Sequence, residues 1–96
     1  MLTFEKVLDV FKDYLSRDKR YEILMTSHGY TVMEWDSRQQ DWADAQFCPN
    51  PQKMKDILLD AYVGYLEYQT THCGRPLTAA EKANIQRSVQ ALSDQL

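Results

Sequence analysis

The chain has 96 residues, of which 44% are hydrophobic and 26% are charged, and its formal net charge is −3 at pH 7. This length predicts a single domain, residues 1–96, and the hydrophobic content excludes a disordered chain. The acidic balance argues against nucleic-acid-binding domains, which usually concentrate positive charge. No hydrophobic run approaches the ~20 residues of a membrane span, and the N-terminus lacks the layout of a signal peptide. We therefore expect a cytoplasmic protein.

The first predicted element is a helix near the N-terminus. Hydrophobic residues from Phe4 to Leu15 recur at intervals of three and four, which is the period of a helix with one buried face. Thr3 is placed to cap the first turn of this helix.

Between Tyr21 and Cys48 the hydrophobic spacing changes to two, which is typical of strands. We interpret this segment as a three-stranded antiparallel meander. The sequence Ser27-His28-Gly29 predicts a three-residue hairpin loop, because a glycine can supply the positive φ that such loops need. The resulting register pairs Tyr21 with Trp35, Ile23 with Met33 and Met25 with Thr31 on the buried face.

Two more helices follow the meander. Asn50 caps and Pro51 opens a helix that extends to about His72 and is hydrophobic on most sides, so we expect it to be buried on more than one side. Thr78 to Glu81 forms a capping box that opens a third helix, which is expected to dock against the second. The predicted fold class is therefore α+β, with a helix, a three-stranded antiparallel meander and two helices packed on the sheet. The buried sheet face is expected to carry Ile23, Met33, Trp35 and Phe47.

The two cysteines, Cys48 and Cys73, lie on either side of the second predicted helix. At ~1.5 Å per residue that helix is on the order of 30 Å long, whereas a disulfide needs Cα atoms within ~7 Å. We therefore expect both thiols to stay reduced. The same separation argues against a zinc site that combines Cys48 with His72, and we expect no metal and no cofactor.

The only basic cluster consists of Arg17, Lys19 and Arg20, and it includes Asp18. We interpret it as a solvated loop between the first helix and the first strand. Three tyrosines recur at intervals of three on the second helix, at Tyr62, Tyr65 and Tyr68. Core packing with hydroxyls that reach water is the favoured interpretation, and an aromatic contact surface is the alternative.

His28 is the best single candidate for catalysis, because histidine alone titrates near neutrality. The order helix, three strands, helix resembles that of double-stranded-RNA-binding domains and of small toxin ribonucleases, in which a histidine lies in or beside the first hairpin. This resemblance implies an alternative function, RNA binding or cleavage that uses His28, Lys53 and Lys55. Those domains carry a lysine-rich start to the next helix, whereas this chain has two lysines followed by Asp56. We therefore interpret His28 as an exposed turn residue.

Three further segments carry a resemblance to another family. The opening Met1-Leu2-Thr3-Phe4-Glu5-Lys6-Val7-Leu8, the hairpin Thr26-Ser27-His28-Gly29-Tyr30-Thr31-Val32 and the helical Leu58-Leu59-Asp60-Ala61-Tyr62 resemble small uncharacterised proteins carried on conjugative transposons of gut bacteria. The resemblance spans the whole chain. It implies a cytoplasmic accessory protein of a mobile element, and it assigns no catalytic residue.

The expected function is that of a small non-catalytic interaction or accessory protein. One sheet face has no assigned cover, and contiguous hydrophobic patches of this kind usually mark a protein partner or self-association. We expect a protein partner or a second copy of the chain, in a homodimer, to dock there, with no membrane or nucleic acid involved. The alternative is that the third helix crosses over and covers this face. The predicted interaction surface consists of Leu24, Tyr30, Val32 and Trp42.

Overall fold

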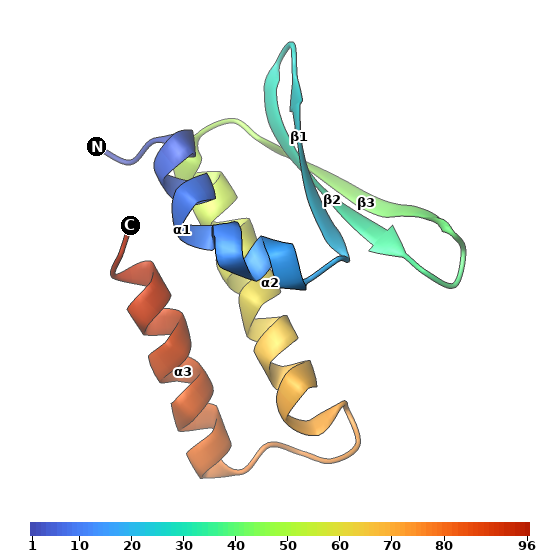
Figure 1. The fold of residues 1–96 in the computed structure, drawn as a ribbon, viewed down its shortest axis with the longest axis vertical. Coiled ribbons are helices and arrows are strands. Elements are labelled where there is room, and N and C mark those ends of the chain that lie inside the picture. Colours follow the sequence, from blue (N-terminus) through green and yellow to red (C-terminus); the bar gives the residue numbers. More distant parts are fainter.

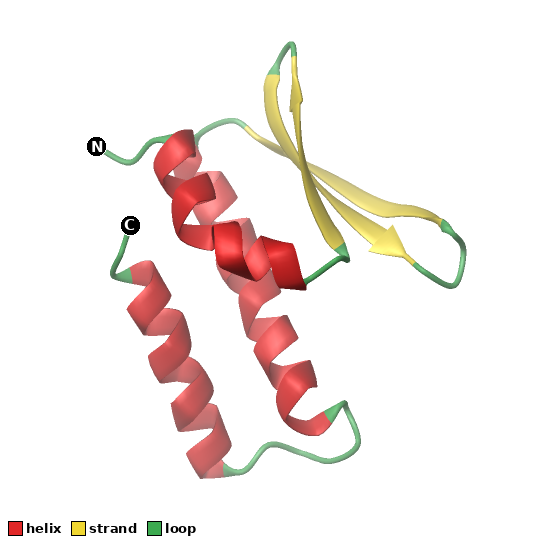
Figure 2. Cartoon of the chain, viewed as in Figure 1, coloured by secondary structure: helices red, strands yellow, loops and turns green.

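The predicted α+β class and the predicted order of elements are confirmed. The computed structural model describes all 96 residues. In Figures 1 and 2 the three helices lie together and the twisted sheet projects from one side of them. The elements are α1 (Phe4–Arg17), β1 (Tyr21–Thr26), β2 (Gly29–Asp36), β3 (Asp41–Cys48), α2 (Pro51–Thr71) and α3 (Ala79–Ser93).

All three predicted helix caps form, so local sequence determines where each helix begins. The Thr3 hydroxyl accepts a 3.1 Å hydrogen bond from a backbone N–H of the first turn of α1. The Asn50 side chain does the same for α2 at 2.8 Å. At α3 the Thr78 hydroxyl accepts from the N–H of Glu81, whose carboxylate accepts from the N–H of Thr78. These bonds satisfy N–H groups that have no partner within the helix.

The core lies where α1 crosses α2 and where one face of the sheet meets both helices (Figure 1). α3 runs beside α2, as predicted, but it contributes no buried residue. Its hydrophobic residues Ile85, Val89 and Leu92 are half-buried along that seam. The core residues are Val7, Phe11, Tyr14, Val32, Cys48, Met54, Ile57, Leu58 and Ala61.

The first hairpin has a two-residue turn, Ser27–His28, so the predicted three-residue loop is wrong. Thr26 pairs with Gly29 across the turn. The Thr26 hydroxyl accepts the N–H of His28 at 3.2 Å and donates to the carbonyl of Gly29 at 3.1 Å. Gly29 still uses its positive φ of 124°, but as the first residue of β2 rather than as part of the loop.

This one-residue shift turns every side chain of β2 to the other face of the sheet. Ile23 pairs with Val32 instead of Met33, and Tyr21 pairs with Glu34 instead of Trp35. The structure tolerates a half-buried carboxylate on the helix-facing side because the Tyr21 hydroxyl donates a 2.8 Å hydrogen bond to Glu34. That bond offsets part of the cost of withdrawing the Glu34 carboxylate from water.

The predicted composition of the buried sheet face is therefore largely wrong. Ile23 does pack against the core, next to the buried Val32. Met33 lies on the other face because it is adjacent to Val32 along β2, and Trp35 follows it at a spacing of two. Phe47 pairs with Thr31 across β2 and β3, so it lies on the same face as Met33 and Trp35, and it is exposed.

A bulge in the pairing of β2 with β3 changes the alternation near Trp42. Glu34 pairs with Asp44, whereas the next residue, Trp35, pairs with Trp42, so Ala43 is an extra residue. Without the bulge Trp42 would share a face with Asp44 and the buried Cys48. Because of the bulge, Trp42 instead lies on the face away from the helices and is 40% exposed, whereas Cys48 is buried in the core.

Candidate functional site

One face of the sheet has no helix over it (Figure 1), and this face carries exposed hydrophobic side chains. Leu24 is 45% exposed, Trp42 is 40% exposed and Phe47 is 48% exposed. α3 packs on α2 and not on the sheet, so the alternative in which it crosses over to cover this face is wrong. We call this region the open sheet face and define it by Leu24, Met33, Trp35, Trp42 and Phe47.

The structure places two of the four predicted interaction residues on the open sheet face. Leu24 and Trp42 lie there, but Val32 is 3% exposed and belongs to the core. Tyr30 is also on the helix-facing side, where its ring packs against Phe4 with centroids 4.9 Å apart. Both errors follow from the one-residue shift in β2.

Sequence reasoning missed Met33, Trp35 and Phe47 as members of the open sheet face. The period-two alternation correctly grouped Met33 with Trp35, and it also separated them from Val32. What it did not decide was which of the two groups meets the helices. The local feature that sets the register is the two-residue turn Ser27–His28, which the Thr26 side chain closes with two hydrogen bonds.

Aromatic packing organises the open sheet face. Trp35 and Trp42 pack edge to face across β2 and β3, with ring centroids 5.1 Å apart and an interplanar angle of 79°. The Phe47 ring lies over Gly29, where an added Cβ would meet it at 3.7 Å. Glu22 is the only charged strand residue that pairs onto this face. The center of the face is therefore aromatic and nearly free of charge.

The overall dimensions show that the chain exposes more surface than its size requires. Its accessible surface is 6561 Å², whereas a folded monomer of this mass has about 5700 Å². Its radius of gyration is 14.1 Å, compared with about 12.5 Å for a compact domain of this length. The projecting sheet and the loosely packed α3 both contribute to this open shape (Figure 1).

The base of the sheet is joined to α1 by a buried carboxylate, Asp18. It accepts hydrogen bonds from the Tyr14 hydroxyl at 2.7 Å and from the Arg20 guanidinium at 3.1 Å and 3.2 Å. Burial is the largest influence on Asp18 and opposes its ionisation, but the bonds from Arg20 and Tyr14 together outweigh it and lower the pKa of Asp18. The carboxylate is therefore charged and structural at neutral pH.

The residues of the RNA-directed alternative lie on two separate segments, the first hairpin and the start of α2. His28 occupies the exposed tip of the first hairpin, where its backbone N–H bonds to Thr26. Lys53 and Lys55 lie at the start of α2. None of the three lines any of the surface pockets. No group of three His, Cys, Asp or Glu side chains is placed to bind a metal ion.

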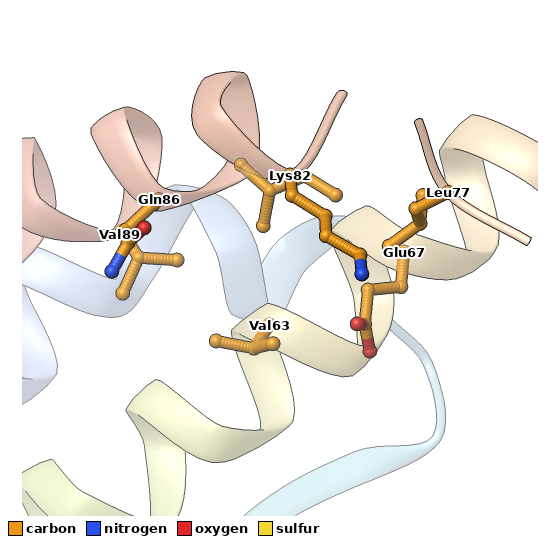
Figure 3. Close-up of a pocket in the computed structure, with 7 residues that line it drawn as sticks. Val63, Glu67, Leu77, Lys82, Gln86 and Val89 are labelled. Carbon is orange, nitrogen blue, oxygen red and sulfur yellow. The ribbon is translucent and has the colours of Figure 1, made fainter. Parts of the chain in front are cut away.

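A small groove separates α2 from α3. It has a volume of about 290 Å³ and is lined by Val63 on α2 and by Ile85 and Val89 on α3. Figure 3 shows Lys82 and Glu67 reaching toward each other at one end of it. The groove follows from the loose seam between the two helices, because α3 buries none of its side chains completely.

None of the helices is long and hydrophobic enough to span a bilayer. Comparison with known proteins found no matching family model, no matching curated protein and no matching solved structure.

Proposed function

We propose that this protein is a small interaction module that self-associates through the open sheet face. The observation that carries the proposal is the exposure of Leu24, Trp42 and Phe47 on one uncovered face. Contiguous exposed hydrophobic residues cost free energy in water, and on soluble proteins they usually mark interfaces. Trp side chains are also enriched where binding energy concentrates.

The charge of the face supports a second copy as the occupant. An isologous dimer packs the same patch against itself, so a patch that carries several charges of one sign would bring like charges together. Glu22, on the edge strand β1, is the only charged strand residue on the open sheet face. Such a face is self-complementary in charge, and it has no pattern of charge that would select a different partner.

The accessible surface area of the chain also supports a second copy as the occupant of the open sheet face. The surface in excess of an ordinary monomer is roughly 850 Å², close to the ~800 Å² that each partner contributes to a standard interface. Two copies packed face to face would form a six-stranded sandwich with sheets ~10 Å apart. The Trp35–Trp42 pair and Phe47 would lie in its interior.

Analytical ultracentrifugation over a wide range of protein concentration tests the proposal. We expect a monomer–dimer equilibrium for the wild type and a shift to monomer for Phe47→Glu and for Trp42→Glu, because each variant places a charge in a hydrophobic interface. Tyr68→Glu is the matched control, since Tyr68 lies on α2 and its exposure of 47% equals that of Phe47 within one percentage point.

Circular dichroism of each variant verifies that the fold is retained. A wild type that stays monomeric at every concentration would contradict the proposal. A Tyr68→Glu variant that dissociates as readily as Phe47→Glu would also contradict it, because association would then involve the helical side of the molecule. Assemblies that grow without limit would exclude a closed two-fold dimer.

A further inference from the structure

We propose that the chain has a second binding site, for a small phosphate monoester, in the angle between the sheet and the C-terminal half of α2. A pocket of about 530 Å³ lies there, within the ~300–1,000 Å³ range of small-molecule sites. It lies on the helix-facing side of the molecule, away from the open sheet face, and the inference does not depend on self-association. The residues that line it are Arg17, Asp18, Arg20, Ser37, Arg38, Tyr65, Tyr68 and Gln69.

The fold brings three arginines from separate segments into this pocket. Arg17 ends α1, Arg20 precedes β1, and Arg38 lies in the turn between β2 and β3. The N–H of Trp35 donates a 2.6 Å hydrogen bond to the carbonyl of Arg20, which joins the start of β1 to the end of β2. The sequence-based interpretation of Arg17 and Arg20 as part of a solvated loop did not include Arg38, which only the sheet brings near them.

Two of the three guanidinium groups have no charged partner. Arg20 forms an ion pair with Asp18, the only acid that lines the pocket. Arg17 and Arg38 form no ion pair within the chain. The nearby Asp36 carboxylate is engaged by the backbone N–H groups of the turn that carries Arg38. The charged residues that line the pocket are three arginines and Asp18, and they sum to a net charge of +2 in a protein whose overall charge is −3. Asp36 is not among the lining residues.

This charge and these donors match a phosphate dianion. A phosphate monoester carries about −1.5 to −2 charge at pH 7 and presents three acceptor oxygens. Guanidinium groups bind phosphate through paired N–H donors, and the hydroxyls of Ser37 and Tyr65 can add further donors. Tyr68 is 47% exposed and gives the pocket a flat aromatic wall. That wall suits an organic group attached to the phosphate better than inorganic phosphate alone.

Titration of the ¹⁵N-labelled full chain, followed by NMR, tests the inference with AMP, inorganic phosphate and adenosine as probes. We expect saturable shifts centered on Arg17, Ser37 and Arg38 with AMP, weaker binding of inorganic phosphate at the same residues, and no binding of adenosine. Arg38→Gln and Arg17→Gln are each expected to weaken AMP binding roughly 10- to 100-fold, the loss of a charge-assisted hydrogen bond.

Arg87→Gln is the matched control, because Arg87 is exposed on α3 and lines no pocket. It should leave AMP binding unchanged. Tyr68→Ala should weaken AMP binding but not phosphate binding. The inference is overturned if AMP shifts residues throughout the chain without saturation, if Arg38→Gln binds AMP as the wild type does, or if adenosine binds as well as AMP. Equal affinities for phosphate and AMP would overturn the monoester assignment.

Discussion

The hydroxyl of Tyr14 donates a 2.7 Å hydrogen bond to the carboxylate of Asp18, which is 3% exposed at the end of α1. Burial, followed by this hydrogen bond, raises the pKa of Tyr14. The same carboxylate holds the Arg20 guanidinium just before β1. One buried acid therefore ties the helical layer to the first strand, at the base of the projecting sheet.

Replacement of this acid should reduce stability in a pH-dependent way. The pKa of Asp18 is lowered in the folded state, so its contribution is fully present above its unfolded value of about 3.9 and is lost as pH falls through the lower folded value. We expect Asp18→Asn to lower the free energy of unfolding at neutral pH by about 1.5–3 kcal/mol. The decline of stability below about pH 4 should also become shallower.

Urea denaturation over a series of pH values measures both effects. Asp9→Asn is the control, because Asp9 is an exposed acid on α1 with no side-chain hydrogen bond. Identical pH profiles for the wild type and Asp18→Asn would show that the ion pair with Arg20 does not stabilise the folded state.

The register of β2 can be tested with two adjacent residues. Val32 is in the core, so Val32→Ala should cost about 2 kcal/mol of stability. Met33 lies on the open sheet face, so Met33→Ala should cost less than about 1 kcal/mol in dilute, monomeric protein. Urea denaturation at low protein concentration gives both values. The reverse order would favour the register that the sequence alone predicted.

Self-association should also be visible in tryptophan fluorescence. The chain has only two tryptophans, and both lie on the open sheet face. Their emission should shift to shorter wavelength as protein concentration rises, because association removes water from both indole rings. Phe47→Glu should abolish the shift and Tyr68→Glu should preserve it. Emission that does not depend on concentration, in a sample that ultracentrifugation finds dimeric, would place the interface elsewhere.

The two thiols should differ strongly in reactivity. Cys73 is exposed, whereas Cys48 is 1% exposed in the core, and burial raises the pKa of its thiol. Because the thiolate is the reactive form, a disulfide reagent should modify Cys73 rapidly and Cys48 only as fast as the fold opens. Cys73→Ser should retain only the slow phase. Rapid modification of Cys48 in that variant would show that the end of β3 is not held in the core.

The order of helices and strands was predictable because it depends on interactions between near neighbours. The caps at Thr3, Asn50 and Thr78 act within four residues, and the change of hydrophobic spacing from four to two is local as well. The reduced state of both cysteines followed from the length of the intervening helix alone, and both are free in the structure. Leu24 and Trp42 were also placed correctly on the exposed side of the sheet.

Tertiary structure decided which face of the sheet is open and which arginines meet. The register of β2 depends on the Thr26 side chain closing the turn and on Tyr21 satisfying Glu34, thirteen residues away. The bulge at Ala43 depends on the pairing of two strands. Arg38 joins Arg17 only because the sheet folds back beside α2. A period of two is unchanged when the pairing slips by one residue, so alternation alone defines two groups of side chains, and long-range contacts select the group that is buried.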